Sequence, residues 1–374
     1  MRKRTWAAIG VVALAAGGGG VTGAVLTVAG SASAHASDAP ATVQSSVIGT
    51  AAPQPLVVTA VAHATATTDA VLLGAVTVQF SRAVDPALVH PTLVPALAGT
   101  WSQPTPTTLA FTPAAVPLPG QQLTLTVPAG DGLAAAYTQT WQTRDADPAR
   151  LQQLLAEDGY LPLSFTPTTA EPTTASALAA SAFAATTGSY AWRFLPPAPL
   201  QALYTGAQST LLTRGALLAF QADHQLATDG VAGPQVWTAL AAALADGQKS
   251  SDPYTSVYVT KSLPETLTLY RDGAKVLSTP ANTGVRGAET PDGSWAVYAR
   301  FASQTMSGTN PDGSHYSDPG VPWISYFVGG DAVHGFPRAT YGSPQSVGCV
   351  ELPIATAQQV YGLMGYGDIV TVAG

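Results

Sequence analysis

Apolar and polar residues alternate in short segments of this chain, and clusters of proline and glycine separate these segments. Alternation places successive side chains on opposite faces of a strand, so it predicts β-strands that are buried on one face. The pattern occurs in two parts of the chain, with a stretch of helical periodicity between them. Because 374 residues are too many for one ordinary core, we predict a multidomain protein that is mostly β.

The composition narrows the function classes. Only 10% of the residues are charged and the formal net charge is −7, so the basic surface that phosphate backbones require is absent. We therefore expect no nucleic-acid partner. The chain has a single cysteine, which rules out an internal disulfide.

Residues 1–36 are predicted to be a signal peptide or a membrane anchor. Three cations at positions 2–4 precede an uncharged stretch that runs to Ala34. The sequence Ala34-His35-Ala36 offers a cleavage site, yet the apolar run is long enough to span a bilayer, so both fates stay open. Residues 37–53 are predicted to be a flexible linker. We expect an extracytoplasmic protein that contacts the membrane only through this N-terminal segment.

Residues 54–146 are predicted to form a small β-sandwich. The segments 75–80, 108–111 and 122–127 alternate apolar and polar residues between turns. With the stretch Phe80-Ser81-Arg82-Ala83-Val84-Asp85, this region resembles a bacterial immunoglobulin-like domain. It has no cluster of His, Cys or carboxylates that suggests chemistry, so we interpret it as a spacer or interaction module.

Residues 147–248 are predicted to form a helical unit. Leu151, Leu154 and Leu155 recur at helical spacing after Asp147-Pro148, whereas residues 166–187 are too weakly patterned to assign and are interpreted as an insertion. The region resembles the small helical peptidoglycan-binding domain of wall enzymes. The matching residues are Phe220-Gln221, Leu226, Asp229-Gly230-Val231-Ala232-Gly233-Pro234, Trp237 and Leu240. The apolar ones among them are expected in the core, because aromatic residues at helical spacing usually face inward.

Residues 252–373 turn β-rich, and two residue types suited to acyl transfer stand near their end. A thiol attacks a carbonyl only as thiolate, so Cys349 needs a base, and a histidine such as His334 is the usual choice. Turn-forming residues separate the two, which lets adjacent strands bring them together. Gly348 lets substrate approach the backbone, where the N–H groups of Gly348 and Cys349 would face an oxyanion.

A zinc site is disfavoured in this region. It has one cysteine and only two histidines, His315 and His334, so a closed site would need carboxylates with no recognisable spacing. We expect no metal and no organic cofactor.

The same stretch resembles the L,D-transpeptidase catalytic domain. His334-Gly335-Phe336 and Ser346-x-Gly348-Cys349-Val350-x-Leu352-Pro353 match its active-site signature, and Asn282-Thr283-Gly284 and Thr290-Pro291-Asp292-Gly293 resemble its turns. The resemblance implies that Cys349 attacks a wall stem tetrapeptide at its third residue and releases the terminal D-alanine. An amine of a neighbouring stem then resolves the thioester into a 3-3 cross-link.

The resemblance also implies roles for single residues. His334 acts as base and then as acid, the N–H of Gly348 supports the oxyanion and Ser346 supports the loop. Substrate contacts are expected from Gly335, Phe336 and Glu351.

Two positions depart from the family pattern. Family members usually carry a histidine where this chain has Val347, and an Arg or Asn where it has Glu351. The first change reduces imidazole or oxyanion support, unless Val347 is simply a strand residue that faces the core. The second repels carboxylates that a guanidinium would bind, unless Glu351 is a solvated acid beside a helix N-terminus.

Two other functions stay open at this stage. A wall-binding protein whose terminal domain has lost activity would use peptidoglycan as a ligand only, but such a domain need not keep Cys349, His334 and Gly348. An L,D-carboxypeptidase would use the same residues and let water resolve the thioester. The sequence does not separate this reaction from transpeptidation.

Overall fold

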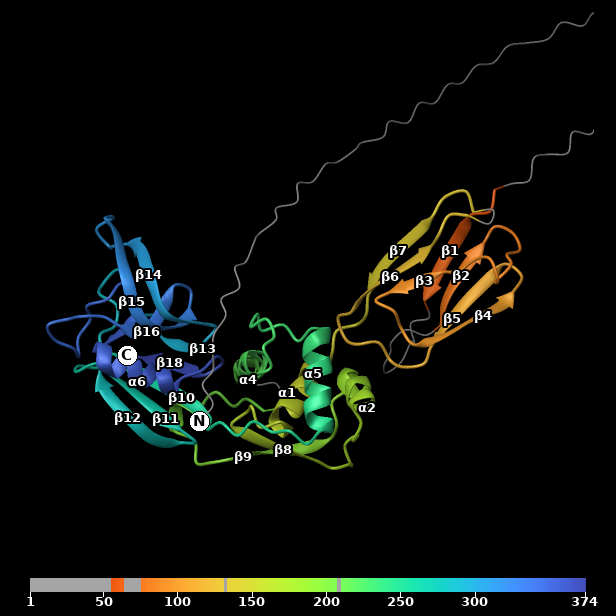
Figure 1. Ribbon diagram of the computed structural model, residues 1–374. Coiled ribbons are helices and arrows are strands. Elements are labelled where there is room, and N and C mark those ends of the chain that lie inside the picture. The colour runs from red at the N-terminus through yellow and green to blue at the C-terminus, as the bar shows by residue number, and fades with distance from the viewer. Residues whose placement is uncertain (1–54, 64–74, 131–132, 207–209) are drawn as a thin grey trace, which may run out of the picture. The chain divides into compact units, whose positions relative to one another are not determined.

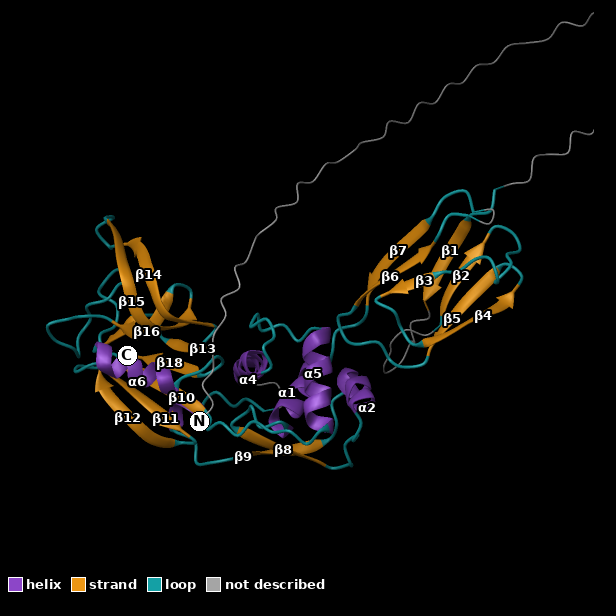
Figure 2. Cartoon of the chain, in the orientation of Figure 1, coloured by secondary structure: helices purple, strands orange, loops and turns teal. Residues whose placement is uncertain are grey.

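The computed structural model describes residues 55–63, 75–130, 133–206 and 210–374 (Figure 1). The predicted signal or anchor segment and the linker lie outside the described residues. Within the described part, no helix is both long enough and apolar enough to cross a bilayer. Helices are concentrated in the middle of the chain and strands dominate on both sides of it (Figure 2). The predicted class, multidomain and mostly β, is confirmed.

The first region is built from two antiparallel sheets, with strand orders β1-β2-β5-β4 and β3-β6-β7. In β2, Val76, Val78 and Phe80 are buried while the two residues between them are not, as the alternation predicts. These side chains join a core that draws on both sheets. The strands are β1 (Val58–His63), β2 (Val76–Phe80), β3 (Thr92–Val94), β4 (Gly99–Thr105), β5 (Thr108–Pro113), β6 (Gln122–Val127) and β7 (Tyr137–Gln142).

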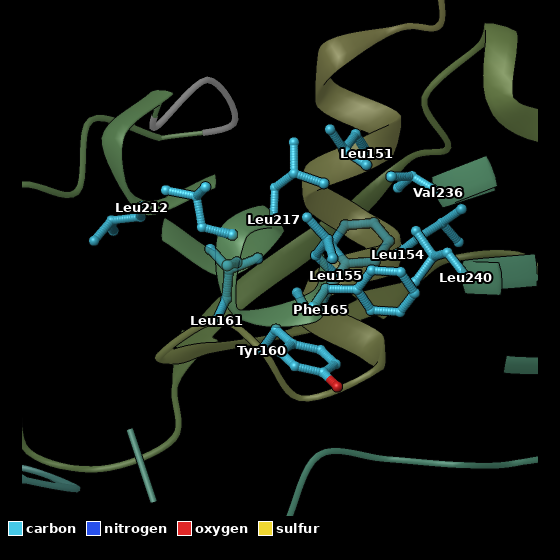
Figure 3. Packing of buried hydrophobic residues seen from close by; sticks show 14 of the residues in the cluster. Leu151, Leu154, Leu155, Tyr160, Leu161, Phe165, Leu212, Leu217, Val236 and Leu240 are labelled. Atoms are coloured by element: carbon cyan, nitrogen blue, oxygen red, sulfur yellow. The ribbon is translucent and has the colours of Figure 1, made fainter. Parts of the chain in front are cut away.

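The middle region packs helices around leucines that the helical periodicity predicts. Helix α1 begins where Asp147 accepts a hydrogen bond from Ala149 N, with Pro148 in the first turn. Leu154 and Leu155 of α1 pack in the cluster shown in Figure 3. The elements are α1 (Pro148–Glu157), β8 (Leu163–Pro167), α2 (Ala175–Ala180), η1 (Ser181–Phe183), β9 (Gly188–Trp192), α3 (Ala198–Gln201), α4 (Thr210–Asp223) and α5 (Pro234–Ala245).

Residues 166–187, which the sequence left unassigned, contain the short helix α2 and the turn η1. Thr174 caps α2 by accepting from Ala177 N, and Leu178 is the only residue of α2 that is buried. A helix of six residues that buries one side chain carries no detectable periodicity, so the pattern could not predict it.

The last region has two sheets, with strand orders β12-β11-β10-β18-β13 and β14-β15-β16-β17. Their core is formed by valines and leucines of both sheets together with one face of α6. Helix α6 begins at Ile354, with Pro353 as its N-cap. The strands of the first sheet are β10 (Thr255–Thr260), β11 (Thr266–Arg271), β12 (Ala274–Pro280), β13 (Gly293–Ala296) and β18 (Ile369–Ala373).

The second sheet holds the segments that carry Cys349 and His334. It begins with a long antiparallel hairpin of β14 (Ala299–Thr309) and β15 (His315–Val328) (Figure 1). A tight turn leads from β15 into β16 (Asp331–Gly335), and β17 (Val350–Leu352) pairs with β16 in parallel. Helix α6 (Ile354–Leu363) follows directly.

Candidate active site

His334 lies on β16, and Cys349 directly precedes β17, the strand that pairs with β16. His334 of β16 is in register with Glu351 of β17, and Cys349 comes two residues before Glu351. Paired residues point to the same face of a sheet, as do residues two apart on one strand. Cys349 packs with Ala332, which lies two residues before His334 on β16, so Cys349 and His334 lie on the same side of the sheet. Both are buried, with 8% and 3% of their surface exposed.

The imidazole of His334 is held by the backbone of the next residue. Its Nδ1 lies 3.1 Å from the carbonyl oxygen of Gly335. Because a carbonyl only accepts, Nδ1 carries the proton and Nε2 is left as the acceptor. Burial lowers the pKa of His334, and the Gly335 hydrogen bond only partly offsets this. The ring is thus a neutral base near pH 7.

The thiol of Cys349 is protonated at rest. Burial raises the pKa of Cys349 to about 12, although a backbone hydrogen bond from Ala332 works in the opposite direction. The charges of Asp331 and Glu351 raise it further. A neutral thiol beside a neutral imidazole means that the thiolate forms only as the proton moves to the base.

The turn before Cys349 requires glycine. Gly348 has a φ of +108°, and a Cβ there would collide with the carboxylate of Asp331. Two hydroxyls fix the turn from either side. Ser346 Oγ donates to the carbonyl oxygen of Cys349 at 2.5 Å, and Thr290 Oγ1 donates to that of Gly348 at 2.6 Å. The contact of Ser346 therefore lies within the loop that carries Cys349.

The upstream turn motifs form the frame behind this loop. Asn282 exchanges two backbone hydrogen bonds with Glu351, at 3.0 and 2.9 Å. Both the N–H and the hydroxyl of Thr283 donate to the buried carboxylate of Glu265 at 2.7 Å. Gly284 N donates to Thr290 Oγ1 at 2.9 Å, which connects the two motifs.

Glu351 is buried and ion-paired, so the interpretation of Glu351 as a solvated acid is wrong. Its carboxylate accepts from Nε and Nη2 of Arg338, both at 2.7 Å, and its side chain is 5% exposed. Arg338 also donates to Gln345 O at 3.0 Å and lies over the ring of Phe336, 4.7 Å from its centre. The pair therefore fastens the loop between β16 and β17, and its charge is compensated.

The other predicted residues occupy different environments. Gly335 is buried, and a Cβ there would press on Ala357 of α6, which explains the glycine by packing. Phe336 is partly exposed and packs with the small cluster that contains Cys349. Val347 lies in a bend and is half-buried, so the interpretation of it as a strand residue facing the core is wrong.

Sequence reasoning missed three residues near the thiol. Tyr316 and Tyr326 of β15 lie close enough that, after burial, the charge of Cys349 is the next cause that raises the pKa of each phenol. Asp331 lies against Gly348. No sequence signal marks them, because the β14–β15 hairpin that positions the tyrosines shows no alternation over most of its length. In the described residues, no group of three or more His, Cys, Asp or Glu is arranged to hold a metal ion.

Two parts of the chain match known protein families, and one of them contains this site. Residues 256–372 match the family described as the L,D-transpeptidase catalytic domain, and residues 208–240 match a family of peptidoglycan binding domains. The chain thus carries an L,D-transpeptidase catalytic domain preceded by a peptidoglycan-binding-type domain. A search of curated proteins found no match.

Solved structures of L,D-transpeptidases are also similar to this chain. The catalytic domain of the Enterococcus faecium enzyme is 25% identical, covering 33% of this chain and all of that one, with a TM-score of 0.30. An enzyme from Mycobacterium tuberculosis is 16% identical over 85% of this chain and 93% of that one, with a TM-score of 0.29. One from Mycobacterium smegmatis is 14% identical over 84% and 100%, with a TM-score of 0.28. With TM-scores this low, the assignment rests on the family matches.

Proposed function

We propose that this protein is a peptidoglycan L,D-transpeptidase that forms 3-3 cross-links through a thioester on Cys349. The observation that carries the proposal is the parallel pairing of β16 and β17, which puts Cys349 and His334 on one face inside a matched L,D-transpeptidase domain. The alternative of a degenerate wall-binding domain is weakened because the loop around Cys349 keeps its glycine and both of its hydroxyl supports.

The first half of the reaction follows from the protonation states. His334 Nε2 takes the thiol proton as the sulfur of Cys349 attacks the carbonyl carbon of the stem's third residue. The carbonyl electron pair moves to oxygen, where the N–H groups of Gly348 and Cys349 are the proposed donors. When the intermediate collapses, the C–N bond breaks and the imidazolium gives its proton to the departing D-alanine amine. A thioester and a neutral His334 remain.

The second half transfers the acyl group. An amine on a neighbouring stem attacks the thioester, the C–S bond breaks and the thiol of Cys349 is restored. The helical domain, which matches the peptidoglycan-binding family, would hold the protein on its polymeric substrate. We place the reaction outside the cytoplasm, in the cell wall, because that is where the proposed substrate lies.

Mass analysis of the products from purified protein and disaccharide tetrapeptides tests this function. A cross-linked dimer that has lost one D-alanine is expected from the native protein, and none from Cys349→Ala. His334→Gln should slow D-alanine release by about 10²–10⁴-fold, the usual contribution of a general base. A tripeptide as the sole product would establish an L,D-carboxypeptidase instead. Unchanged turnover in Cys349→Ala would contradict the mechanism.

A related L,D-transpeptidase has been solved in complex with imipenem. We propose that the same drug acylates Cys349 here, which intact-protein mass measurement detects as one added drug mass. Such an adduct tests the nucleophile without needing a wall substrate. An inactive ligand-binding domain would give no adduct at excess drug.

A further inference from the structure

The carboxylate of Asp331 lies beside the nucleophile and the steps above leave it without a role. Asp331 is the first residue of β16, at the turn from β15 and three positions before His334. Its Oδ1 lies over the backbone of Gly348, so close that no Cβ could be placed there. The carboxylate therefore borders the loop that presents Cys349, and its negative charge acts on the thiol.

Asp331 has no structural partner that would explain it. In the described residues its side chain makes no hydrogen bond and no ion pair, although it is only partly exposed. Burial accordingly raises the pKa of Asp331. The titratable groups that sense its charge are Cys349, Tyr298 just before β14, and Tyr316 of β15, and none of them is a cation. A half-buried carboxylate left unpaired beside a nucleophile is characteristic of functional sites.

We propose that Asp331 is a second catalytic residue, which attracts the ammonium group of the acceptor stem and takes a proton from it when the thioester is resolved. The role rests on the proposed transpeptidase function. The surroundings of Asp331 favour it, because a carboxylate with no competing cation attracts an ammonium group more strongly than it attracts neutral water.

The proton balance of the second half-reaction leaves room for this role. His334 is neutral after acylation, and the acceptor arrives as an ammonium ion that must lose two protons in all. One proton goes to Asp331 before the attack. The other goes to His334 Nε2 as the C–N bond forms and the C–S bond breaks, and His334 then returns it to the thiolate of Cys349. Asp331 releases its proton to water, so both groups regain their starting state.

The isosteric variant Asp331→Asn separates the two half-reactions. Acylation of Cys349 should be unchanged or a few-fold faster, because a charge that opposes the thiolate is gone. It is measured by imipenem adduct formation and by D-alanine release in a single turnover. Cross-link formation should fall by about 10²-fold, within the range of general-base contributions. The ratio of hydrolysed tripeptide to cross-linked product should rise, and the acidic limb of the pH profile of cross-linking should disappear.

Asp292→Asn is the matched control, because Asp292 is an exposed acid of the same domain that pairs with Lys261. It should leave both half-reactions unchanged. Asp331→Ala is a second variant, and its imipenem adduct reports whether the loop is still folded. An unchanged product ratio in both Asp331 variants, or an equal fall in acylation and cross-linking, would overturn the role. If the native protein forms no acyl-enzyme with tetrapeptide or drug, the proposed function fails first and the role of Asp331 fails with it.

Discussion

The polar residues around Arg150 in the helical region and those around Cys349 differ in how completely they are hydrogen-bonded. All three guanidinium nitrogens of the fully buried Arg150 donate, to Glu171, Ser181, Gln153 and Thr186. Around Cys349, only the residues of the supporting frame have their hydrogen-bond partners. The sulfur of Cys349 has only a backbone hydrogen bond from Ala332 and a long contact, 4.0 Å, with Gly330 O, and Asp331 has no partner in the described part of the chain. Full pairing marks a structural group here, and incomplete pairing marks reactive ones.

A single substitution in the Arg150 network should have the largest effect on the free energy of unfolding. Arg150→Met removes the fully buried cation and leaves the partly buried Glu171 without its charge partner, which we expect to cost about 3–5 kcal/mol. Thermal or urea unfolding measures it. Arg82→Met is the matched control, because Arg82 is an exposed arginine of the first region, and it should change stability by less than about 0.5 kcal/mol. A loss below about 1 kcal/mol for Arg150→Met would show that this network contributes little to the stability of the fold.

The pH dependence of thiol alkylation tests the protonation state of Cys349. Because burial raises the pKa of Cys349 to about 12, the thiolate fraction increases about tenfold per pH unit throughout the range 7–10. Modification by iodoacetamide should therefore be about 100-fold faster at pH 9 than at pH 7, with no plateau. Cys349 is the only thiol of the chain, so labelling is read directly by mass. A plateau near neutral pH would mean that His334 already holds the thiol as a thiolate.

The stability cost of breaking the ion pair of Glu351 and Arg338 should be smaller than that of breaking the Arg150 network. Each single change, Glu351→Gln or Arg338→Gln, is expected to cost about 1–3 kcal/mol, because it strands a partly buried charge. The double variant should cost less than the sum of the two, with a coupling energy of about 1–2 kcal/mol. Additive costs in this double-mutant cycle would show that the two side chains do not depend on each other.

The same contrast separates what the sequence could predict from what it could not. Val76, Val78 and Phe80 alternate with polar residues, and the helical spacing of Leu154 and Leu155 is local, so both elements were predictable. The segments of Cys349 and His334 carried motif residues and turn signals. The Arg338–Glu351 pair depends on a loop that folds back across thirteen positions, and no local pattern encodes it. Asp331 was missed for a related reason, since its position over Gly348 follows from the pairing of β16 with β17.

Val347 is the position where the smallest effect is expected. The family pattern has a histidine there, and in a buried site an added imidazole without a partner would cost stability. Val347 lies in a bend and is half-buried, however, so the ring of Val347→His keeps its contact with water. We expect a stability change within about 0.5 kcal/mol, measured by thermal unfolding. The rate of imipenem acylation should change by less than about threefold, because burial is the main cause of the raised thiol pKa and the substitution does not relieve it. A rise in that rate by tenfold or more at unchanged melting temperature would show that the native site lacks a hydrogen-bond donor that the histidine supplies.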